Sequence, residues 1–266
     1  MDLISDLSMA RTNWGIHVKI LALWNNPSRG IVLEKRMIVV DVKGNYIEVI
    51  VPNRTYRKAF VRNLSEGKWF YLENFQVFPC KSTCFALNTY EIRCMWETTM
   101  VSVSDKTSNN FYHFVFPSEV ENALDVQFHH VTDAVGVVVS LSPIRRIPFV
   151  CRENETDYSA RYVKLTIKDN MGNRTTCIAL GECCETVVKK VTTILSSPSY
   201  NYQPIVAMMR FWRVQAFEGK NVVMSVDDCA RVYINPTFED FDLERYIRSF
   251  SDPESDAVYM EEVASN

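Results

Sequence analysis

A ring and a positive charge flank a tight turn in the last quarter of the chain. Phe217, Glu218, Gly219 and Lys220 stand between two apolar runs, where a glycine-containing turn favours a β-hairpin. Turn tips face solvent, and an exposed ring is a platform on which an unpaired base can stack. Lys220 would place a charge for a phosphate beside that platform. The plainer interpretation of Phe217 is a ring that caps the end of a barrel of strands.

Four other residues are weaker candidates for the same kind of site. Phe85 lies in the loop before the last predicted strand of the first half, and could stack on a base or enter the core. Arg213, on a predicted strand, and Arg146 and Arg29, in predicted loops, are candidates for phosphate contacts. Charged residues are mostly exposed in any protein, so each cation is weighed against an ordinary surface role.

Residue patterns typical of catalysis and metal binding are absent from the sequence. It contains no Walker loop, GxGxxG, HExxH or GxSxG pattern, so we expect a protein that is not an enzyme. Cys80 and Cys84 give one metal-ligand spacing without the second pair that structural zinc requires. We therefore expect no metal and no cofactor. Other cysteines fit reduced, small apolar side chains: Cys94, Cys151, Cys177 and Cys229.

Apolar periodicity predicts five strands and a helix in the first half of the chain. Between Trp14 and Trp24 the alternation is close to period two, which is typical of a strand with one buried face. A turn at Gly44 separates two apolar runs and predicts a hairpin. The predicted elements are strands 14–24, 37–42, 46–51, 69–78 and 90–103, with a helix over 54–64.

The second half repeats this order. Small and β-branched residues predict a buried first strand, and the polar stretch 143–157 predicts a long loop after it. A turn around Gly172 predicts another hairpin. The predicted elements are strands 132–141, 162–168, 174–180, 204–217 and 221–234, with a helix over 185–195.

The repeated order predicts a mainly β protein of two five-stranded Greek-key OB-fold barrels in tandem, each with a helix between its third and fourth strands. We expect the first barrel over residues 1–110 and the second over 111–240. A short helix and an acidic, partly disordered tail would occupy 241–266. With 266 residues the chain is long enough for two separate cores. Four tryptophans lie within predicted strands and are expected in or near the cores: Trp24, Trp69, Trp96 and Trp212.

The net charge of −3 is unevenly distributed. Residues 1–110 hold 14 Lys and Arg against 10 Asp and Glu, residues 111–237 hold 13 against 13, and residues 238–266 hold 2 against 9. This balance excludes a strong duplex binder that works by charge alone. No apolar run approaches the roughly 18 residues of a membrane span, so we expect no membrane association. We also expect the acidic tail to fold over the basic surface and lower its affinity for nucleic acid.

Both halves resemble the tandem barrels of the large subunit of replication protein A, in particular its plant-type paralogues. The resemblance covers residues from about 12 to 240 and rests on the order and spacing of several segments. In the first half these are WGIHVKILALW, IVVDVKGNYIEVIV, FVRNLSEGKW and NTYEIRCMWETTMV. In the second half they are HHVTDAVGVVVSLSP, VKLTIKDNMGNRTTCIALGE and VQAFEGKNVVMSVDDCARVYINP.

The resemblance implies a nuclear protein that binds single-stranded DNA in preference to RNA. Family members stack bases on two aromatic residues per barrel and hold phosphates with Lys and Arg. Phe217 matches the stacking Phe of the second barrel, and Phe85 lies near that of the first. Leu180 stands where the family has a Trp, and Val51 where it has the first barrel's other ring. Glu48 stands where the family often has Arg.

These departures leave two alternatives open. Each lost stacked base costs about 1–3 kcal/mol, so a groove lined by Leu180 and Val51 could accept a protein partner instead. The barrels would then be a protein-interaction scaffold that has partly lost nucleic-acid binding. A single-stranded RNA ligand is the second alternative. The sequence leaves the oligomeric state open.

Overall fold

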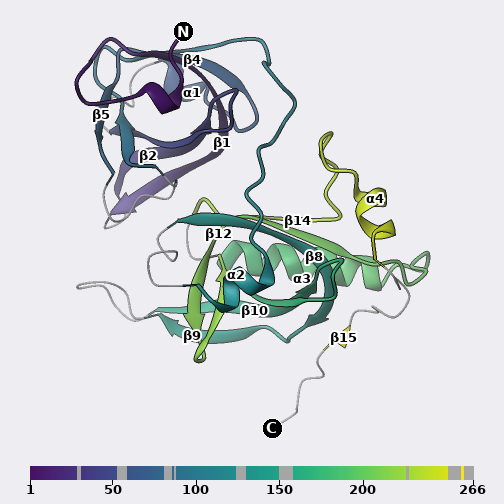
Figure 1. The fold of residues 1–266 in the computed structure, drawn as a ribbon. Coiled ribbons are helices and arrows are strands. Elements are labelled where there is room, and N and C mark those ends of the chain that lie inside the picture. The colour runs from purple at the N-terminus through teal and green to yellow at the C-terminus, as the bar shows by residue number, and fades with distance from the viewer. Residues whose placement is uncertain are drawn as a thin grey trace. The chain divides into compact units, whose positions relative to one another are not determined.

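The computed structural model describes residues 1–28, 31–52, 59–80, 86, 88–123, 130–149, 158–225, 228–250 and 259–260. The chain divides into two compact units: unit 1 comprises Met1–Phe111 with His129–Val131, and unit 2 comprises Tyr112–Phe128 with Thr132–Asn266. Each unit is mainly β, with one curled sheet and few helices, and is consistent with an OB-fold (Figure 1). Among the described residues, no helix is long and apolar enough to cross a membrane.

The sheet of unit 1 has seven strands. The described elements are η1 (Ile4–Asp6), β1 (Gly15–Ser28), β2 (Ile31–Val40), β3 (Tyr46–Pro52), α1 (Ala59–Arg62), β4 (Trp69–Glu73), β5 (Gln76–Pro79), β6 (Tyr90–Arg93) and β7 (Thr99–Ser102). The strand order is β5-β6-β3-β2-β1-β4-β7. β1, β2 and β3 pair antiparallel, and β3 pairs parallel with β6. β4 pairs with β1, and β5 pairs with β6.

A bulge in β1 determines which side chains enter the core of unit 1. Ile16, Val18 and Ile20 alternate along the strand and have no exposed surface. The register of β1 against β2 shifts after Ile20, which marks a bulge. The extra residue reverses the faces that follow, so Leu23 packs against the core cluster and Trp24 lies on the other face.

One turn design recurs in the two units. Asp41 Oδ1 accepts hydrogen bonds from the backbone N–H groups two and four residues on, at 2.9 and 3.0 Å. Asp169 Oδ1 does the same at 2.9 and 2.8 Å. Gly44 and Gly172, three residues after each Asp, have φ values of 86° and 88°. An acceptor side chain and a residue free to adopt positive φ are what this turn requires. The pairing of the flanking strands confirms both predicted hairpins.

Unit 2 contains an eight-stranded sheet and the longest described helix. Its described elements are α2 (Pro117–Glu121), β8 (Val131–Leu141), β9 (Arg145–Phe149), β10 (Tyr158–Lys168), β11 (Arg174–Leu180), α3 (Gly181–Leu195), β12 (Val206–Phe217), β13 (Lys220–Met224), β14 (Arg231–Ile234), α4 (Leu243–Arg248) and β15 (Tyr259–Met260). The path through the sheet is β14-β12-β13-β11-β10-β8-β15, and β9 pairs with β10.

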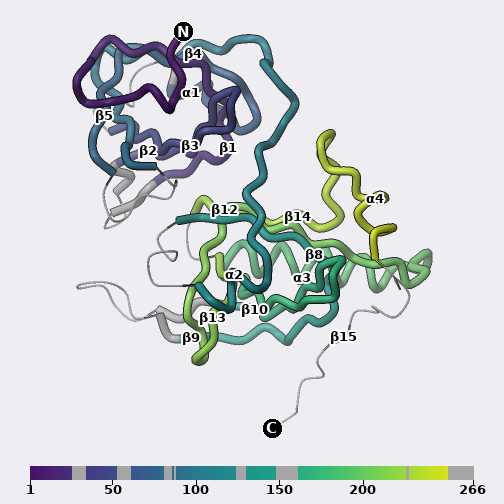
Figure 2. Tube along the Cα trace, viewed as in Figure 1, coloured from purple at the N-terminus to yellow at the C-terminus, as the bar shows by residue number. Residues whose placement is uncertain are grey.

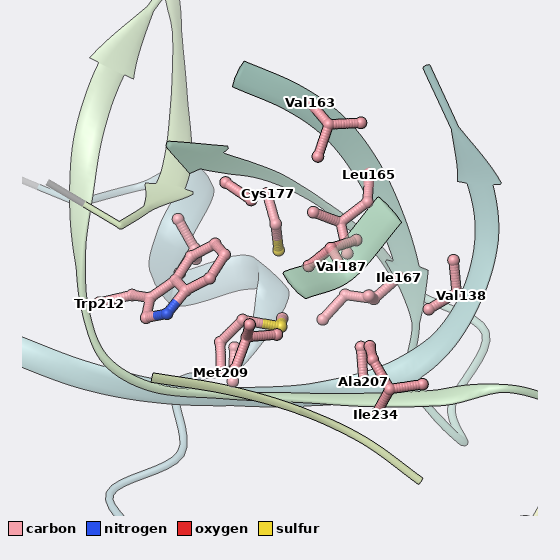
Figure 3. Packing of buried hydrophobic residues seen from close by; sticks show 14 of the residues in the cluster. Val138, Val163, Leu165, Ile167, Cys177, Val187, Ala207, Met209, Trp212 and Ile234 are labelled. Carbon is pink, nitrogen blue, oxygen red and sulfur yellow. The ribbon is translucent and has the colours of Figure 1, made fainter. Parts of the chain in front are cut away.

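The strand pairs of unit 2 form a closed circuit. β10 pairs antiparallel with β8 and with β11, and β11 pairs parallel with β13. β12 then joins β13 back to β8. Side chains from these strands meet one face of α3 inside the circuit. Figure 3 shows Val187 of α3 among Leu165, Ile167 and Cys177, all of them in the same buried cluster.

Several predicted element bounds are wrong. The stretch 143–157 is not all loop, because its residues 145–149 form β9, which pairs with the start of β10. The predicted strand 69–78 is divided at Asn74, whose φ is 56°, into β4 and β5. The last predicted strand of each half is also two strands, β6 and β7 in unit 1 and β13 and β14 in unit 2. α4 confirms the short helix expected near the end of the chain.

The core position expected for Trp96 is wrong. A turn at Trp96 interrupts the predicted strand between β6 and β7, and this side chain is 63% exposed. A turn residue has no sheet to cover its ring, which explains the exposure. The other three tryptophans predicted in or near the core are buried, as expected: Trp24, Trp69 and Trp212.

Candidate nucleic-acid interface

Seven apolar side chains gather on the face of β10, β11 and β13 that points away from the core of unit 2. Val163, Cys177 and Val223 on these strands belong to the core, so the residues that alternate with them face outward. These outward residues form a second cluster, here called the outer cluster. Its buried members are Tyr162, Ile178, Leu180, Val222 and Met224, and the partly buried Ile147 and Phe217 pack against them.

The hairpin between β12 and β13 holds Phe217 at one edge of the outer cluster. Phe217 and Lys220 are direct partners in the ladder, with Glu218 and Gly219 as the two turn residues. Both turn residues have positive φ, 51° and 77°, as a type I′ turn requires. This turn fixes the register, so the ring and the Lys220 side chain leave the hairpin at the same level. Phe217 is partly exposed and Lys220 is exposed.

Tyr162 is an aromatic member of the outer cluster that the sequence did not single out. Its ring centroid lies 5.6 Å from that of Phe217, with an interplanar angle of 67°, which is an edge-to-face contact. Tyr162 is 7% exposed and stands directly opposite Leu180 in the ladder of β10 and β11. The available signal was its alternation with Val163, which places the ring outside the core.

The predicted cations of unit 2 differ in exposure. Arg146 lies on β9 and is exposed, opposite Arg161 in the ladder with β10. Ile147, the next residue on β9, packs on the outer cluster, so the side chain of Arg146 points to the opposite face, away from that cluster. In Figure 2, β9 lies at the same end of unit 2 as β13. Arg213 is only 9% exposed, so little of its side chain is open to a phosphate.

Two of the predicted site residues, Phe85 and Arg29, lie outside the residues that the structure describes. Their stacking and phosphate roles remain predictions. The described site therefore belongs to unit 2, where the hairpin brings Phe217 and Lys220 together, while Arg146 points away from them.

The corresponding strands of unit 1 carry ion pairs on their outer face. Val51 has no exposed surface and belongs to the core cluster, so the prediction that it lines a groove with Leu180 is wrong. Successive side chains of a strand point to opposite faces of the sheet, and Val51 and Glu48 are three residues apart. Because Val51 points inward, Glu48 points outward. Glu48 is 1% exposed and lies 2.9 Å from Arg36, which also contacts Glu34 at 2.9 Å.

A second ion pair extends this face. Arg93 lies 2.7 Å from Glu91 and its guanidinium lies 5.2 Å from the ring centroid of Phe78. β6, which carries both members of the pair, is the parallel neighbour of β3, and Glu91 is the register partner of Glu48. Acidic groups thus neutralise Arg36 and Arg93 within the protein.

The described residues contain no group of three or more side chains that could hold a metal ion. The thiols are also poor nucleophiles, because burial raises the pKa of Cys94 to about 12 and that of Cys184 to about 11. Burial raises the pKa of Cys177 as well. Cys80 is disulfide-bonded, and Cys84 lies outside the described residues.

A buried ion pair fixes the start of unit 2 to its sheet. Asp133 on β8 accepts hydrogen bonds from the backbone N–H groups of His113 (2.9 Å) and Phe211 (3.1 Å). Arg210 Nε lies 3.5 Å from the same carboxylate, and its guanidinium lies 4.7 Å from the ring centroid of Tyr112. Burial raises the pKa of Asp133, while Arg210 and the two N–H groups act to lower it.

Comparison with known proteins identifies the fold. Residues 5–122 match a family model described as a domain of unknown function, DUF223. A solved replication protein A heterotrimer bound to single-stranded DNA is similar to 98% of this chain, with a TM-score of 0.61 and 16% identity. This protein has the same fold, and it spans 57% of the length of the matched replication protein A chain.

Two further solved structures are less similar. A murine DNA-binding protein bound to duplex DNA matches 86% of this chain and 98% of its own, with 12% identity and a TM-score of 0.40. The Ifi202 HINa domain in complex with duplex DNA matches 83% of this chain and 95% of its own, with 12% identity and a TM-score of 0.42. No curated protein matches the sequence.

Proposed function

We propose that this protein binds single-stranded DNA on the outer cluster of unit 2 and catalyses no reaction. The observation that carries the proposal is the hairpin site. Phe217 and Tyr162 meet edge to face at 5.6 Å above an apolar floor, and the exposed Lys220 is the ladder partner of Phe217. Rings beside a cation are what non-specific single-strand binding requires, because every base has a π-face and every nucleotide a phosphate.

The topology of unit 2 supports this location. Its circuit of β8, β10, β11, β13 and β12, with α3 between β11 and β12 in the sequence, supports the proposal that unit 2 is a five-stranded OB barrel to which β9, β14 and β15 are added. OB-folds bind oligonucleotides on the face of their second and third strands, between the first and last strand-connecting loops. In unit 2 these strands are β10 and β11, and the outer cluster covers that face.

Tyr162 offsets one of the family's missing rings. Leu180 stands where the resemblance places a Trp, and Tyr162 is the residue directly across the ladder from it. Cross-strand partners lie about 4.5–5.5 Å apart at their Cβ atoms. The ring of Tyr162 is therefore next to the position that Leu180 occupies in place of the family's Trp. The second barrel would thus keep two rings, one partly exposed at the hairpin and one buried against it.

The finer features of the proposal rest on the sequence resemblance. It favours DNA over RNA, a nuclear protein, and a place among plant-type paralogues of the replication protein A large subunit. The near-neutral charge of residues 111–237 supports a mode of binding in which stacking contributes more than charge.

Fluorescence anisotropy with a labelled single strand of about 30 nucleotides tests the proposal. Phe217→Ala should raise the Kd about 5- to 160-fold, which corresponds to 1–3 kcal/mol for one stacked base. Tyr202→Ala is the matched control, because this ring is 73% exposed in the same unit and lies outside the outer cluster. Wild-type binding no tighter than about 10 μM, the range of weak non-specific binding, would reject the proposal. An unchanged Kd for Phe217→Ala would reject the assigned site.

A second candidate function, protein binding, is favoured by the ion pairs of unit 1. Arg36 and Arg93 are held by Glu34, Glu48 and Glu91, so this face offers phosphates little positive charge. Unit 1 would then serve as a protein-interaction barrel and unit 2 as a DNA-binding one. A salt titration separates the two functions: nucleic-acid affinity falls steeply with ionic strength, whereas an apolar protein interface does not depend on it in this way.

A further inference from the structure

A pocket of about 480 Å³ lies beside the hairpin of β12 and β13. β11 contributes Arg174 and Thr175 to its lining, the hairpin contributes Lys220 and Asn221, and α2 contributes Val120. The volume falls within the range of small-molecule sites. The pocket shares Lys220 with the proposed DNA site but none of the members of the outer cluster.

Two basic side chains lie at the same level of the sheet in this pocket. β11 and β13 pair in parallel, and extending their register brings Arg174 level with Lys220. Lys168 of β10 is directly opposite Arg174 on the other side. Like charges on neighbouring strands are destabilising. The side chains of Arg174 and Lys220 form no hydrogen bond or ion pair with any residue that the structure describes. The lining holds one acid, Glu121, against the two cations Arg174 and Lys220, so it carries a net positive charge.

Thr176 adds a hydroxyl group to the lining. It stands two residues after Arg174 on β11, so its side chain lies on the same face of the strand as Arg174, whereas the buried Thr175 between them points toward the core. Thr176 is partly exposed, so a ligand held by Arg174 can reach its hydroxyl.

The surroundings of the pocket are fixed without a ligand. Val120 of α2 is 2% exposed and belongs to the core of unit 2. Asn221 Nδ2 donates to the backbone carbonyl groups of Glu121 (3.3 Å) and Ala123 (3.2 Å), which ties the end of α2 to β13. A site held in this way loses little conformational entropy when it binds.

We infer that this pocket is an anion site that binds a phosphate group. Arg174 can hold a phosphate through two parallel N–H groups, Lys220 adds a second charge, and Thr176 adds a neutral donor. The inference rests on the proposed function in one respect: the phosphate is assigned to a DNA strand that crosses the outer cluster. The ladder partner of Lys220 is Phe217, so a strand stacked on that ring passes the mouth of the pocket.

The first test measures single-strand binding as a function of salt for Arg174→Gln and Thr176→Val. Lys190→Gln on α3 is the charge-matched control, because it removes one exposed positive charge of unit 2 away from the pocket. Arg174→Gln should raise the Kd about five- to tenfold at low salt and reduce the slope of log K against log salt by about 0.7. Thr176→Val should weaken binding without changing the slope. Strands with and without a 5′-phosphate distinguish a terminal from an internal phosphate.

The second test uses inorganic phosphate alone and follows backbone amide signals by NMR. The site predicts saturable shifts at Arg174–Thr176 that disappear in Arg174→Gln and are not reproduced by chloride at equal ionic strength. If wild type binds no DNA but phosphate still shifts these amides, the proposed function fails and the anion site stands. If DNA binds and both pocket variants behave as Lys190→Gln does, with no phosphate shifts, the anion site is wrong and the proposed function stands.

Discussion

The edge-to-face contact between Tyr162 and Phe217 predicts that the two rings act as one unit in DNA binding. Tyr162 is 7% exposed and Phe217 is partly exposed, so a base can reach Phe217 first. Tyr162 is then a positioning residue, whose ring 5.6 Å away holds Phe217 in one orientation. Aromatic pairs of this geometry contribute about 0.5–1.5 kcal/mol beyond the area they bury. Tyr162→Leu keeps the apolar floor but removes this contact, so it should raise the Kd about 2- to 13-fold.

A double-mutant cycle measured by anisotropy tests this coupling. Once Phe217 is replaced by Ala, no ring remains for Tyr162 to orient, so adding Tyr162→Leu should change the Kd less than twofold. Thermal unfolding of all four proteins controls for loss of folded protein, and the Tyr202→Ala variant controls for loss of an exposed ring. Fully additive costs in the cycle would refute the positioning role, because they would mean that each ring contacts DNA independently.

The remaining predictions concern the ion pairs, the tail and the thiols. Arg210→Met leaves Asp133 buried without its cation and should lower the free energy of unfolding by about 3–5 kcal/mol at pH 8. Burial raises the pKa of Asp133 and Arg210 acts to lower it, so in the variant the carboxyl should take up a proton more readily and the loss should shrink as the pH falls to 5. Urea unfolding at the two pH values measures this change, and an equal loss at both would contradict it. Truncation after Phe250 removes five acidic residues and β15, which pairs with Ser140 and Leu141 of β8. If the acidic tail lowers the affinity for DNA, the truncated protein should bind DNA more tightly, and an unchanged Kd would reject autoinhibition by the tail. Iodoacetamide at neutral pH should leave Cys94 and Cys177 unmodified in the native protein, as measured by mass spectrometry, because both thiols are buried and their pKa values are raised; rapid native labelling would contradict their burial.

Local patterns in the sequence were sufficient for the hairpins and for most of the core. The Asp-x-x-Gly-Asn turns carry their own acceptor and their own positive-φ residue, so they specify the flanking register without help from distant contacts. Alternation then assigns one face of each strand to the core, as it does for Val163 and Leu165 in unit 2. Phe217 was accessible to the same reasoning because its turn is local.

Features that depend on pairing between distant segments could not be predicted in this way. β9 is short, begins with two arginines and contains a proline, and it forms a strand because it pairs with the first residues of β10. Tyr162 gains its role from a ring on a strand far along the chain, and no short-range pattern encodes that contact. Val51 was assigned to the wrong face because a shift of one residue moves a side chain to the opposite side of a sheet.

Photocrosslinking tests the central claim, that a single strand of DNA lies on the outer cluster of unit 2, most directly. A strand carrying photoreactive uracil analogues is irradiated in complex with the full-length chain, and the linked residues are identified by mass spectrometry. Crosslinks should fall on the hairpin from Phe217 to Lys220, and they should be lost from it in Phe217→Ala. Crosslinks confined to unit 1, or spread evenly over the surface with no enrichment at the hairpin, would contradict the account.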